Sequence, residues 1–144
     1  MDEIHRLIPH RQPFLFIDHV IEVSKDGAKT GLCISDEMPF FKGHYPGNPI
    51  MTGVLLCESV FQTGAVFLSK ELIGEDNLND ESVTPVLSRI RDARFKRMVK
   101  PGDDLVISVT LIDQIGQFYN LRGEVRNGDK VVMTISFALA LVKQ

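Results

Sequence analysis

The chain has 144 residues, a formal net charge of −3 and a hydrophobic content of 44%. These averages are typical of a single folded domain, here expected over residues 1–144, and they exclude disordered, collagen-like and coiled-coil proteins. No stretch is apolar for long enough to span a membrane, and the N-terminal residues lack the pattern of a secretory signal. The slightly acidic charge gives no reason to expect nucleic-acid binding.

The first third of the chain predicts a helix, a hairpin and a loop. Apolar residues at helical spacing predict a short helix over residues 2–8. Residues 14–23 and 28–35 are rich in strand-forming side chains and are separated by an Asp-Gly turn, so we expect a β-hairpin. Residues 36–49 contain three prolines and two glycines, which predict an irregular loop of fixed shape.

A long helix is predicted over residues 53–73, with Thr52 as its N-cap and Gly74 as its end. This segment is apolar on nearly every side, and a helix of that kind is normally buried. An acidic linker follows at residues 71–81, which carry five carboxylates and no basic residue.

The remaining residues alternate between strand and turn signals, including the hairpin turn Asn127-Gly128. The predicted strands are 85–97, 104–113, 117–126 and 130–142. With the first hairpin, they predict an α+β fold in which an antiparallel six-stranded sheet wraps around one long central helix, because sheet and helix each need the other's apolar face.

Among the four histidines, His44 has the most constrained backbone. Its neighbours include two glycines and two prolines, which fix the loop and favour a role in which the side chain must be aimed. His5, His10 and His19 lie in contexts that favour surface or structural roles.

Glu58 is unusual because it lies in the apolar helix. Desolvation should raise its pKa, as a general acid requires. A structural alternative is a buried carboxyl held by Ser59, Gln62 or the backbone. Gln62, one helical turn later, could hold Glu58 in either case.

Gly53 lies in the first turn of the predicted helix, where backbone N–H groups have no partner within the helix. A glycine allows a ligand carbonyl to approach closely. Together with His44 and Glu58, such an N–H would suit proton abstraction next to a carbonyl group.

The two cysteines, Cys33 and Cys57, have no metal-ligand spacing, and we expect two small buried thiols. Reduced thiols indicate a cytoplasmic setting.

Three segments carry a resemblance to a known family: LIPHRQPFLFID (7–18), PFFKGHYPGNPIMTGVLLCESVFQTG (39–64) and ARFKRMVKPGD (93–103). They resemble the (3R)-hydroxyacyl-acyl carrier protein dehydratases of bacterial type II fatty-acid synthesis, from about Ile4 to Val142. The resemblance implies the hotdog fold and a hydro-lyase that converts a 3-hydroxyacyl-acyl carrier protein into the trans-2-enoyl product without a metal or organic cofactor. It also implies a homodimer, with trimers of dimers in some members, and an active site at the dimer interface.

Carried over by position, the resemblance implies that His44 and Glu58 are catalytic, with Glu58 facing the His44 of the other subunit. Gly53 would bind the thioester carbonyl and Gln62 would support Glu58. Tyr45 and Val54, which follow His44 and Gly53, are further candidate substrate-binding residues. Two positions depart from the family pattern: Thr52 and Met98 stand where proline is usual.

The predicted strand 85–97 and the residues after it form a basic cluster that could dock an acidic carrier protein and receive the phosphate of its pantetheine arm. Alternatively, these charges belong to a solvated strand face and discourage edge pairing. The cluster consists of Arg89, Arg91, Arg94, Lys96, Arg97 and Lys100. Phe61, Phe67 and Leu68 could likewise line an acyl tunnel or simply pack in the core.

Three other functions remain open from the sequence. A hotdog thioesterase would have no need of His44, and the related isomerases usually carry Asp at the position of Glu58. A non-catalytic acyl-binding hotdog protein would lose the His/Glu pair, which this chain retains.

Overall fold

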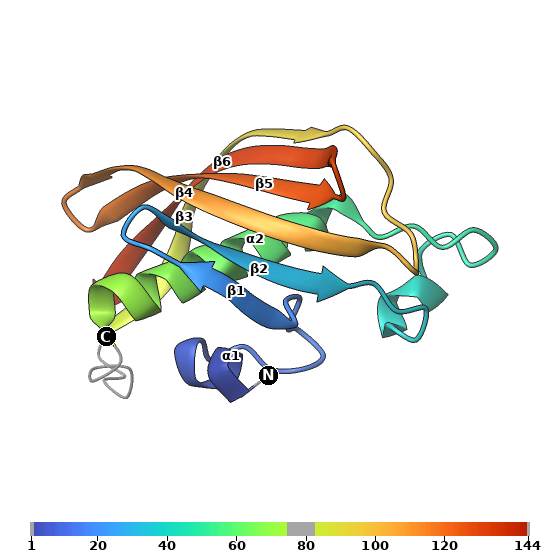
Figure 1. The fold of residues 1–144 in the computed structure, drawn as a ribbon, viewed down its shortest axis with the longest axis horizontal. Coiled ribbons are helices and arrows are strands. Elements are labelled where there is room, and N and C mark those ends of the chain that lie inside the picture. Colours follow the sequence, from blue (N-terminus) through green and yellow to red (C-terminus); the bar gives the residue numbers. More distant parts are fainter. Residues whose placement is uncertain (1, 75–82, 144) are drawn as a thin grey trace.

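In the computed structural model, which describes residues 2–74 and 83–143, one antiparallel sheet curls around one long helix (Figure 1). All neighbouring strands are antiparallel, in the order β1-β2-β4-β5-β6-β3, so the expected six-stranded sheet and central helix are confirmed. The elements in chain order are α1 (Asp2–Leu7), β1 (His19–Val23), β2 (Gly27–Cys33), the 3-10 turn η1 (Pro39–Lys42), α2 (Gly53–Phe67), η2 (Leu68–Ile73), β3 (Val83–Phe95), β4 (Asp104–Ile115), β5 (Phe118–Asn127) and β6 (Lys130–Lys143).

The predicted strand 14–23 is wrong over its first half. Strand structure begins only at His19, although Leu15, Phe16 and Ile17 are buried. The backbone before β1 pairs instead with a side chain of α2: Gln62 accepts a hydrogen bond from Phe16 N at 2.8 Å and donates one to Phe14 O at 3.0 Å. A side-chain amide therefore replaces a neighbouring strand here.

The central helix packs closely on the sheet. A Cβ on Gly123 of β5 would collide with Val60, so this glycine permits the close approach. The polar residues on the buried side are satisfied locally: Thr63 Oγ1 lies 2.7 Å from Thr30 Oγ1 of β2 and donates to Ser59 O at 2.8 Å. Phe67 and Leu68 are fully buried, which favours the core-packing alternative for these two residues.

The ends of the helical segment are close to those predicted. Thr52 occupies the N-cap position, but its side chain makes no capping hydrogen bond. At the other end, η2 continues the helical path to Ile73, and Gly74 ends it with a φ of 83°. Most of the predicted acidic linker, residues 75–81, lies outside the described residues.

The two edge strands of the sheet differ in length and exposure. β1 has five residues, whereas β3 has 13, and every residue from Val86 to Phe95 is exposed. The hydrophobic residues Val86, Leu87, Ile90 and Phe95 are 40–51% exposed. In the single chain, β3 therefore presents an unpaired edge together with apolar side chains.

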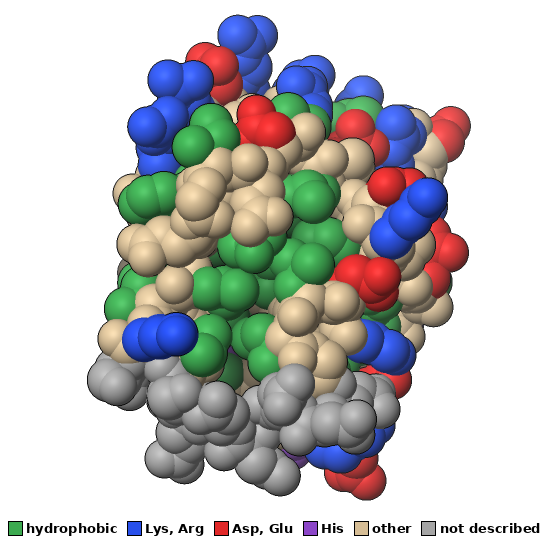
Figure 2. All heavy atoms as spheres, turned by 90° about the vertical axis from the view of Figure 1, so that its left-hand side faces the viewer, with side chains coloured by type: hydrophobic (Ala, Val, Ile, Leu, Met, Phe, Trp, Pro, Cys, Tyr) green, Lys and Arg blue, Asp and Glu red, His purple; other side chains and the backbone are tan. Residues whose placement is uncertain are grey.

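Hydrophobic side chains also gather at one end of the molecule, between basic and acidic ones (Figure 2). The β4–β5 turn lies at this end (Figure 1), and its exposed hydrophobic residues are Ile112, Ile115 and Phe118.

The expectation of two buried thiols is confirmed for Cys57 and is wrong for Cys33. Cys33 ends β2 at an outward-facing position, where its Sγ donates to Asp104 Oδ1 at 3.3 Å. That hydrogen bond is the main reason why the pKa of Cys33 is raised, with burial and the charges of Asp104 and Asp18 acting in the same direction. No helix in the described part of the chain has the length and hydropathy needed to cross a membrane.

Candidate active site

His44 lies in the loop between η1 and α2 and is half-buried. Its Nδ1 lies 2.6 Å from the carbonyl oxygen of Ile50. A carbonyl oxygen can only accept a hydrogen bond, so Nδ1 carries a proton, and in the neutral ring the lone pair is therefore on Nε2. The loop thus fixes both the direction and the tautomer of the ring, and it leaves Nε2 able to accept a proton.

The residue after His44 gives the loop its sharp turn. Tyr45 has a φ of 52°, and its carbonyl accepts a hydrogen bond from Asn48 N at 2.8 Å. The Tyr45 ring is 61% exposed and meets the His44 ring edge to face, with 4.7 Å between the ring centroids. The exposed Tyr45 side chain therefore packs directly against the imidazole.

Glu58 is half-buried in the first half of α2. Burial raises its pKa above the ordinary value, and a hydrogen bond from Gln62 opposes this shift. Desolvation is the larger of the two effects, so the carboxyl group holds its proton at higher pH than a glutamate in water. This bears out the expected direction of the shift and suits a proton donor.

Gln62 is fully buried and connects Glu58 with the segment before β1. Its amide bonds the backbone of Phe14 and Phe16 and also faces Glu58 one turn earlier. Because both ends of the amide are fixed by backbone partners, its orientation is set by the fold. The proposed support of Glu58 by Gln62 therefore has a structural basis, whereas Ser59 bonds Leu56 O instead.

Gly53 is the first residue of α2, so its N–H belongs to the four without a partner inside the helix. A Cβ on Gly53 would lie 2.8 Å from Cε1 of Phe95, the last residue of β3. Next to it, Val54 is 75% exposed. The start of α2 thus offers a polar N–H beside an aromatic ring and an exposed apolar side chain.

In the described part of the single chain, no ion pair joins the two predicted catalytic side chains. Within the described residues, no hydrogen bond joins His44 to Glu58. The two departures from the family pattern lie together, because Met51 N donates to Val99 O at 2.8 Å and this bond is flanked by Thr52 and Met98. The two residues that stand in place of the usual prolines, Thr52 and Met98, therefore lie near each other at the entry to α2.

The six predicted docking residues are all exposed. Arg94 and Lys96 line a cavity of about 240 Å³, to which Asp92, Arg122, Thr134 and Ser136 also contribute. In the parts of the chain that the structure describes, Arg94, Lys96 and Arg122 form no ion pair. Arg89 and Arg91 line a second cavity of about 240 Å³, and Arg97 and Lys100 line neither. The sequence analysis missed Arg122, which alternation along the strand 117–126 could have placed on this outer face.

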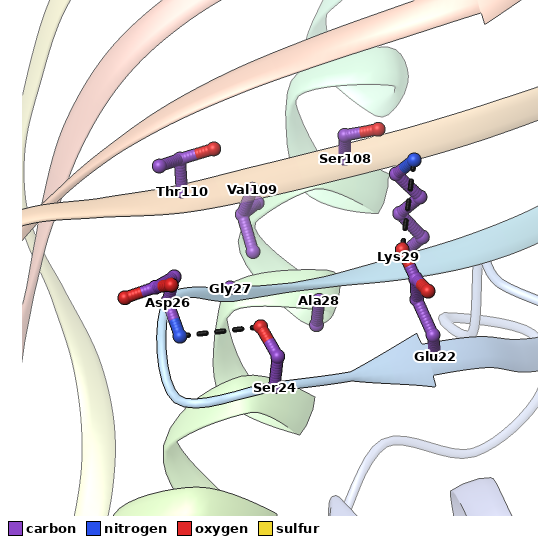
Figure 3. Close-up of a pocket in the computed structure, with 9 residues that line it drawn as sticks. All are labelled: Glu22, Ser24, Asp26, Gly27, Ala28, Lys29, Ser108, Val109 and Thr110. Atoms are coloured by element: carbon purple, nitrogen blue, oxygen red, sulfur yellow. Dashed lines mark hydrogen bonds and ion pairs between the residues drawn. The ribbon is translucent and has the colours of Figure 1, made fainter.

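A different pocket, of about 150 Å³, lies where β1, β2 and β4 meet (Figure 3). Its polar groups pair with each other: Lys29 Nζ lies 3.5 Å from Glu22 Oε1, and Asp26 N donates to Ser24 Oγ at 3.2 Å. None of the predicted site residues lines it, so it is not the candidate site.

Comparison with known proteins places the chain in a family. Residues 8–136 match the model of the FabA-like domain. The 3-hydroxyacyl-[acyl-carrier-protein] dehydratase FabZ of Caulobacter vibrioides is 37% identical over 142 residues, which cover 98% of this chain and 87% of that protein. The FabZ protein of Caldicellulosiruptor bescii is 40% identical over 136 residues, covering 92% and 86%.

Solved structures confirm the hotdog fold. The dehydratase heterocomplex ApeI:P from Xenorhabdus doucetiae contains a chain with a TM-score of 0.83 and 21% identity, covering 98% of this chain and 91% of that one. The uncharacterized protein PH1136 from Pyrococcus horikoshii has a TM-score of 0.69 at 19% identity, covering 92% and 88%. By its family match and its FabZ relatives, the chain belongs to the FabA-like family.

Proposed function

We propose that the protein is a 3-hydroxyacyl-acyl carrier protein dehydratase in which His44 and Glu58 carry the chemistry. The observation that carries this assignment is the His44 ring, whose Nδ1 is bonded to Ile50 O, so that Nε2 is free to accept a proton. The FabZ relatives support the substrate class. The raised pKa of Glu58 supports its role as the acid.

The reaction is the elimination of water from a (3R)-3-hydroxyacyl thioester. His44 Nε2 takes the proton from C2, and the electron pair of that C–H bond forms the C2–C3 double bond. The C3–O bond breaks as Glu58 donates its proton, so the hydroxyl leaves as water. His44 then carries the proton from C2 and Glu58 is left ionised, and proton exchange with solvent returns both groups to their starting states.

The start of α2 stabilises the charge that develops during this step. As the C2 proton leaves, negative charge moves onto the thioester oxygen, and the Gly53 N–H is placed to donate to it. The positive end of the helix dipole acts in the same direction. Val54 and Tyr45 would contact the substrate beside this oxygen and beside His44, respectively.

The test is turnover of 3-hydroxybutyryl-carrier protein and longer homologues, followed by the absorbance of the enoyl thioester. We expect activity in the wild type and a loss of about 10²-fold or more in His44→Ala and in Glu58→Gln. Activity near that of the wild type in either variant would overturn the assignment of that residue. A wild type inactive with every chain length would favour the acyl-binding alternative.

We further propose that the site is completed in a homodimer, with Glu58 of one chain facing His44 of the other. Support comes from the lack of a hydrogen bond or ion pair between the two described residues within one chain and from the exposed edge of β3. Paired β3 strands would join two sheets into one and would cover Leu87, Ile90 and Phe95.

Mixed dimers test this arrangement. Chains carrying His44→Ala are co-refolded with chains carrying Glu58→Gln, each inactive alone. If the site is shared, one of the two sites in every mixed dimer keeps both groups, and about a quarter of wild-type activity returns after random pairing. If both groups of a site come from one chain, no activity returns.

The β3 interface is tested by placing a charge on each edge strand in turn. Ile90 of β3 and Ile21 of β1 are similarly exposed, at 51% and 48%. We expect Ile90→Glu to sediment as a monomer and Ile21→Glu to match the wild type, because only Ile90 lies at the proposed interface. Unchanged sedimentation of both variants would contradict the β3 interface. The wild-type profile also distinguishes a dimer from a trimer of dimers.

We propose that the basic cluster docks the acidic carrier protein. Support comes from the cavity shared by Arg94, Lys96 and Arg122, where unpaired cations and the hydroxyls of Thr134 and Ser136 could receive a phosphate group. Long-range attraction of this kind mainly raises the rate of association and weakens with salt. We keep the cytoplasm as the proposed compartment, with two free thiols in support.

Charge reversal tests the docking surface. Arg94→Glu combined with Lys96→Glu should raise KM for carrier-protein substrates and leave pantetheine thioesters unaffected. Lys25→Glu combined with Lys29→Glu makes the same change of charge at the β1–β2 turn and should change neither value. An equal effect of the two double variants would show that only total charge matters.

A further inference from the structure

Phe95, the last residue of β3, packs against the start of α2, and the proposed chemistry does not use it. Three atoms of its ring, Cε1, Cζ and Cδ1, lie 2.8, 3.0 and 3.2 Å from the position that a Cβ on Gly53 would occupy. No side chain fits between the ring and the helix at this point. The ring is nevertheless 51% exposed in the single chain, so only part of it is used to pack on Gly53.

The direction of the contact places the ring at the helix end. Cα–Cβ bonds in an α-helix tilt toward the N-terminus. The Phe95 ring lies in the direction of that bond at Gly53, so it lies beside the N-terminal end of α2. The first N–H groups of the helix point outward at this end. A carbonyl oxygen that accepts from Gly53 N–H would have its carbon atoms next to the Phe95 ring.

The backbone holds the ring in this position. Phe95 pairs with Met133 at the end of β3, and the next two N–H groups, of Lys96 and Arg97, both donate to Val132 O at 2.8 and 3.3 Å. Four residues after Phe95, the bond from Met51 N to Val99 O at 2.8 Å ties the same segment to the entry of α2. The backbone that carries Phe95 is thus tied to the sheet on one side and to the helix entry on the other.

We propose that Phe95 is a specificity-determining residue that selects acyl thioesters without a branch at C2. This inference rests on the proposed function, because it takes Gly53 N–H as the donor to the thioester oxygen. When the thioester oxygen on C1 accepts from that N–H, C2 must face His44 to lose its proton. The Phe95 ring then borders the substrate site beside C1 and C2. A methyl group on C2 would have to enter space that the ring occupies.

Pantetheine thioesters test the inference without involving carrier-protein docking. The substrates are (3R)-3-hydroxybutyryl-pantetheine and the two C2 epimers of its 2-methyl analogue, each followed by enoyl absorbance. We expect wild-type kcat/KM to favour the unbranched substrate over the better epimer by about 10- to 200-fold, the range that one methyl group in a tight pocket commands.

Phe95→Leu should reduce this preference by about tenfold, because the smaller side chain leaves space for a methyl group on C2. Phe95→Tyr should keep the preference, because it retains the ring. Phe118→Leu is the matched control: it also shortens an exposed phenylalanine of the same sheet, at the β4–β5 turn, and should leave the preference unchanged. Sedimentation of each variant shows whether assembly is intact.

The outcomes separate the two proposals. If the wild type does not dehydrate the unbranched thioester, the proposed function fails. If it does and Phe95→Leu changes kcat/KM equally for branched and unbranched substrates, Phe95 has only a structural role and the inference is overturned. A wild type that accepts the 2-methyl substrates as well as the unbranched one also overturns it.

Discussion

From Gly53 to Glu58, the first half of α2 is partly open, and its residues include the exposed Val54. From Ser59 to Phe67, the second half is buried except for Phe61. The polar side chains of the second half bond to the helix backbone, to β2 or to the segment before β1. The first half instead contains N–H groups without a partner in the helix and a desolvated carboxyl. One continuous helix thus combines a half that stabilises the fold with a half that is available for binding and proton transfer.

We expect the largest effect on activity from replacing Glu58. The same replacement should change the pH dependence of stability. Glu58→Gln should lower kcat by about 10²- to 10⁴-fold. Burial raises the folded-state pKa of Glu58 above the unfolded value of 4.5, so wild-type stability falls as the pH rises through the interval between these two values. The Gln variant cannot ionise and should lack this loss. Urea unfolding at several pH values measures the difference, and parallel pH profiles of the two proteins would contradict it.

Gln62 belongs to the second half but hydrogen-bonds Glu58 of the first half, so its replacement should affect both properties. Gln62→Met leaves Phe16 N–H and Phe14 O without their partner, at a cost of about 1–3 kcal/mol. It also removes the hydrogen bond that lowers the pKa of Glu58, so that pKa should rise further. Activity should then persist to higher pH than in the wild type. Lower stability with an unchanged pH profile would limit Gln62 to a structural role.

Thr63 tests the second half of α2 by itself, because its hydroxyl bonds Thr30 and Ser59 and no residue of the first half. Thr63→Val should cost about 1–2 kcal/mol in urea unfolding, because the buried Thr30 hydroxyl loses its partner at 2.7 Å. Turnover should stay at the wild-type level, since no proposed site residue bonds to Thr63. Replacing both threonines with valine should recover part of the lost stability. A fall in kcat together with stability would show that the two halves are coupled.

The smallest expected effect is that of Val54 in the first half. Because Val54 is 75% exposed, Val54→Ala should change the unfolding free energy by less than about 0.5 kcal/mol. If Val54 contacts substrate, KM should rise by a few-fold, and kcat should change little. Unchanged KM for both pantetheine and carrier-protein substrates would remove Val54 from the site.

Much of this division could be predicted from the sequence, because it depends on local patterns. An apolar helix with a carboxyl near its start predicts both burial and a raised pKa, and alternation placed the C-terminal strands to within about two residues. The strand before His19 was wrong because its hydrogen-bond partner, Gln62, is 46 residues away from Phe16. Phe95 was missed for the same reason: its contact with Gly53 depends on how β3 meets α2, and no pattern within either segment encodes that meeting.

The unpaired edge of β3 affects how readily the single chain aggregates. One side of this 13-residue strand has open backbone groups that could recruit further strands. Arg89, Arg91 and Arg94 place like charges along this edge, so copies that approach edge to edge repel one another at low ionic strength. Salt screens that repulsion and leaves the apolar side chains exposed. Newly made or diluted protein should therefore aggregate more readily in concentrated salt, and the same arginines that could attract a carrier protein would also act as a safeguard against misassembly.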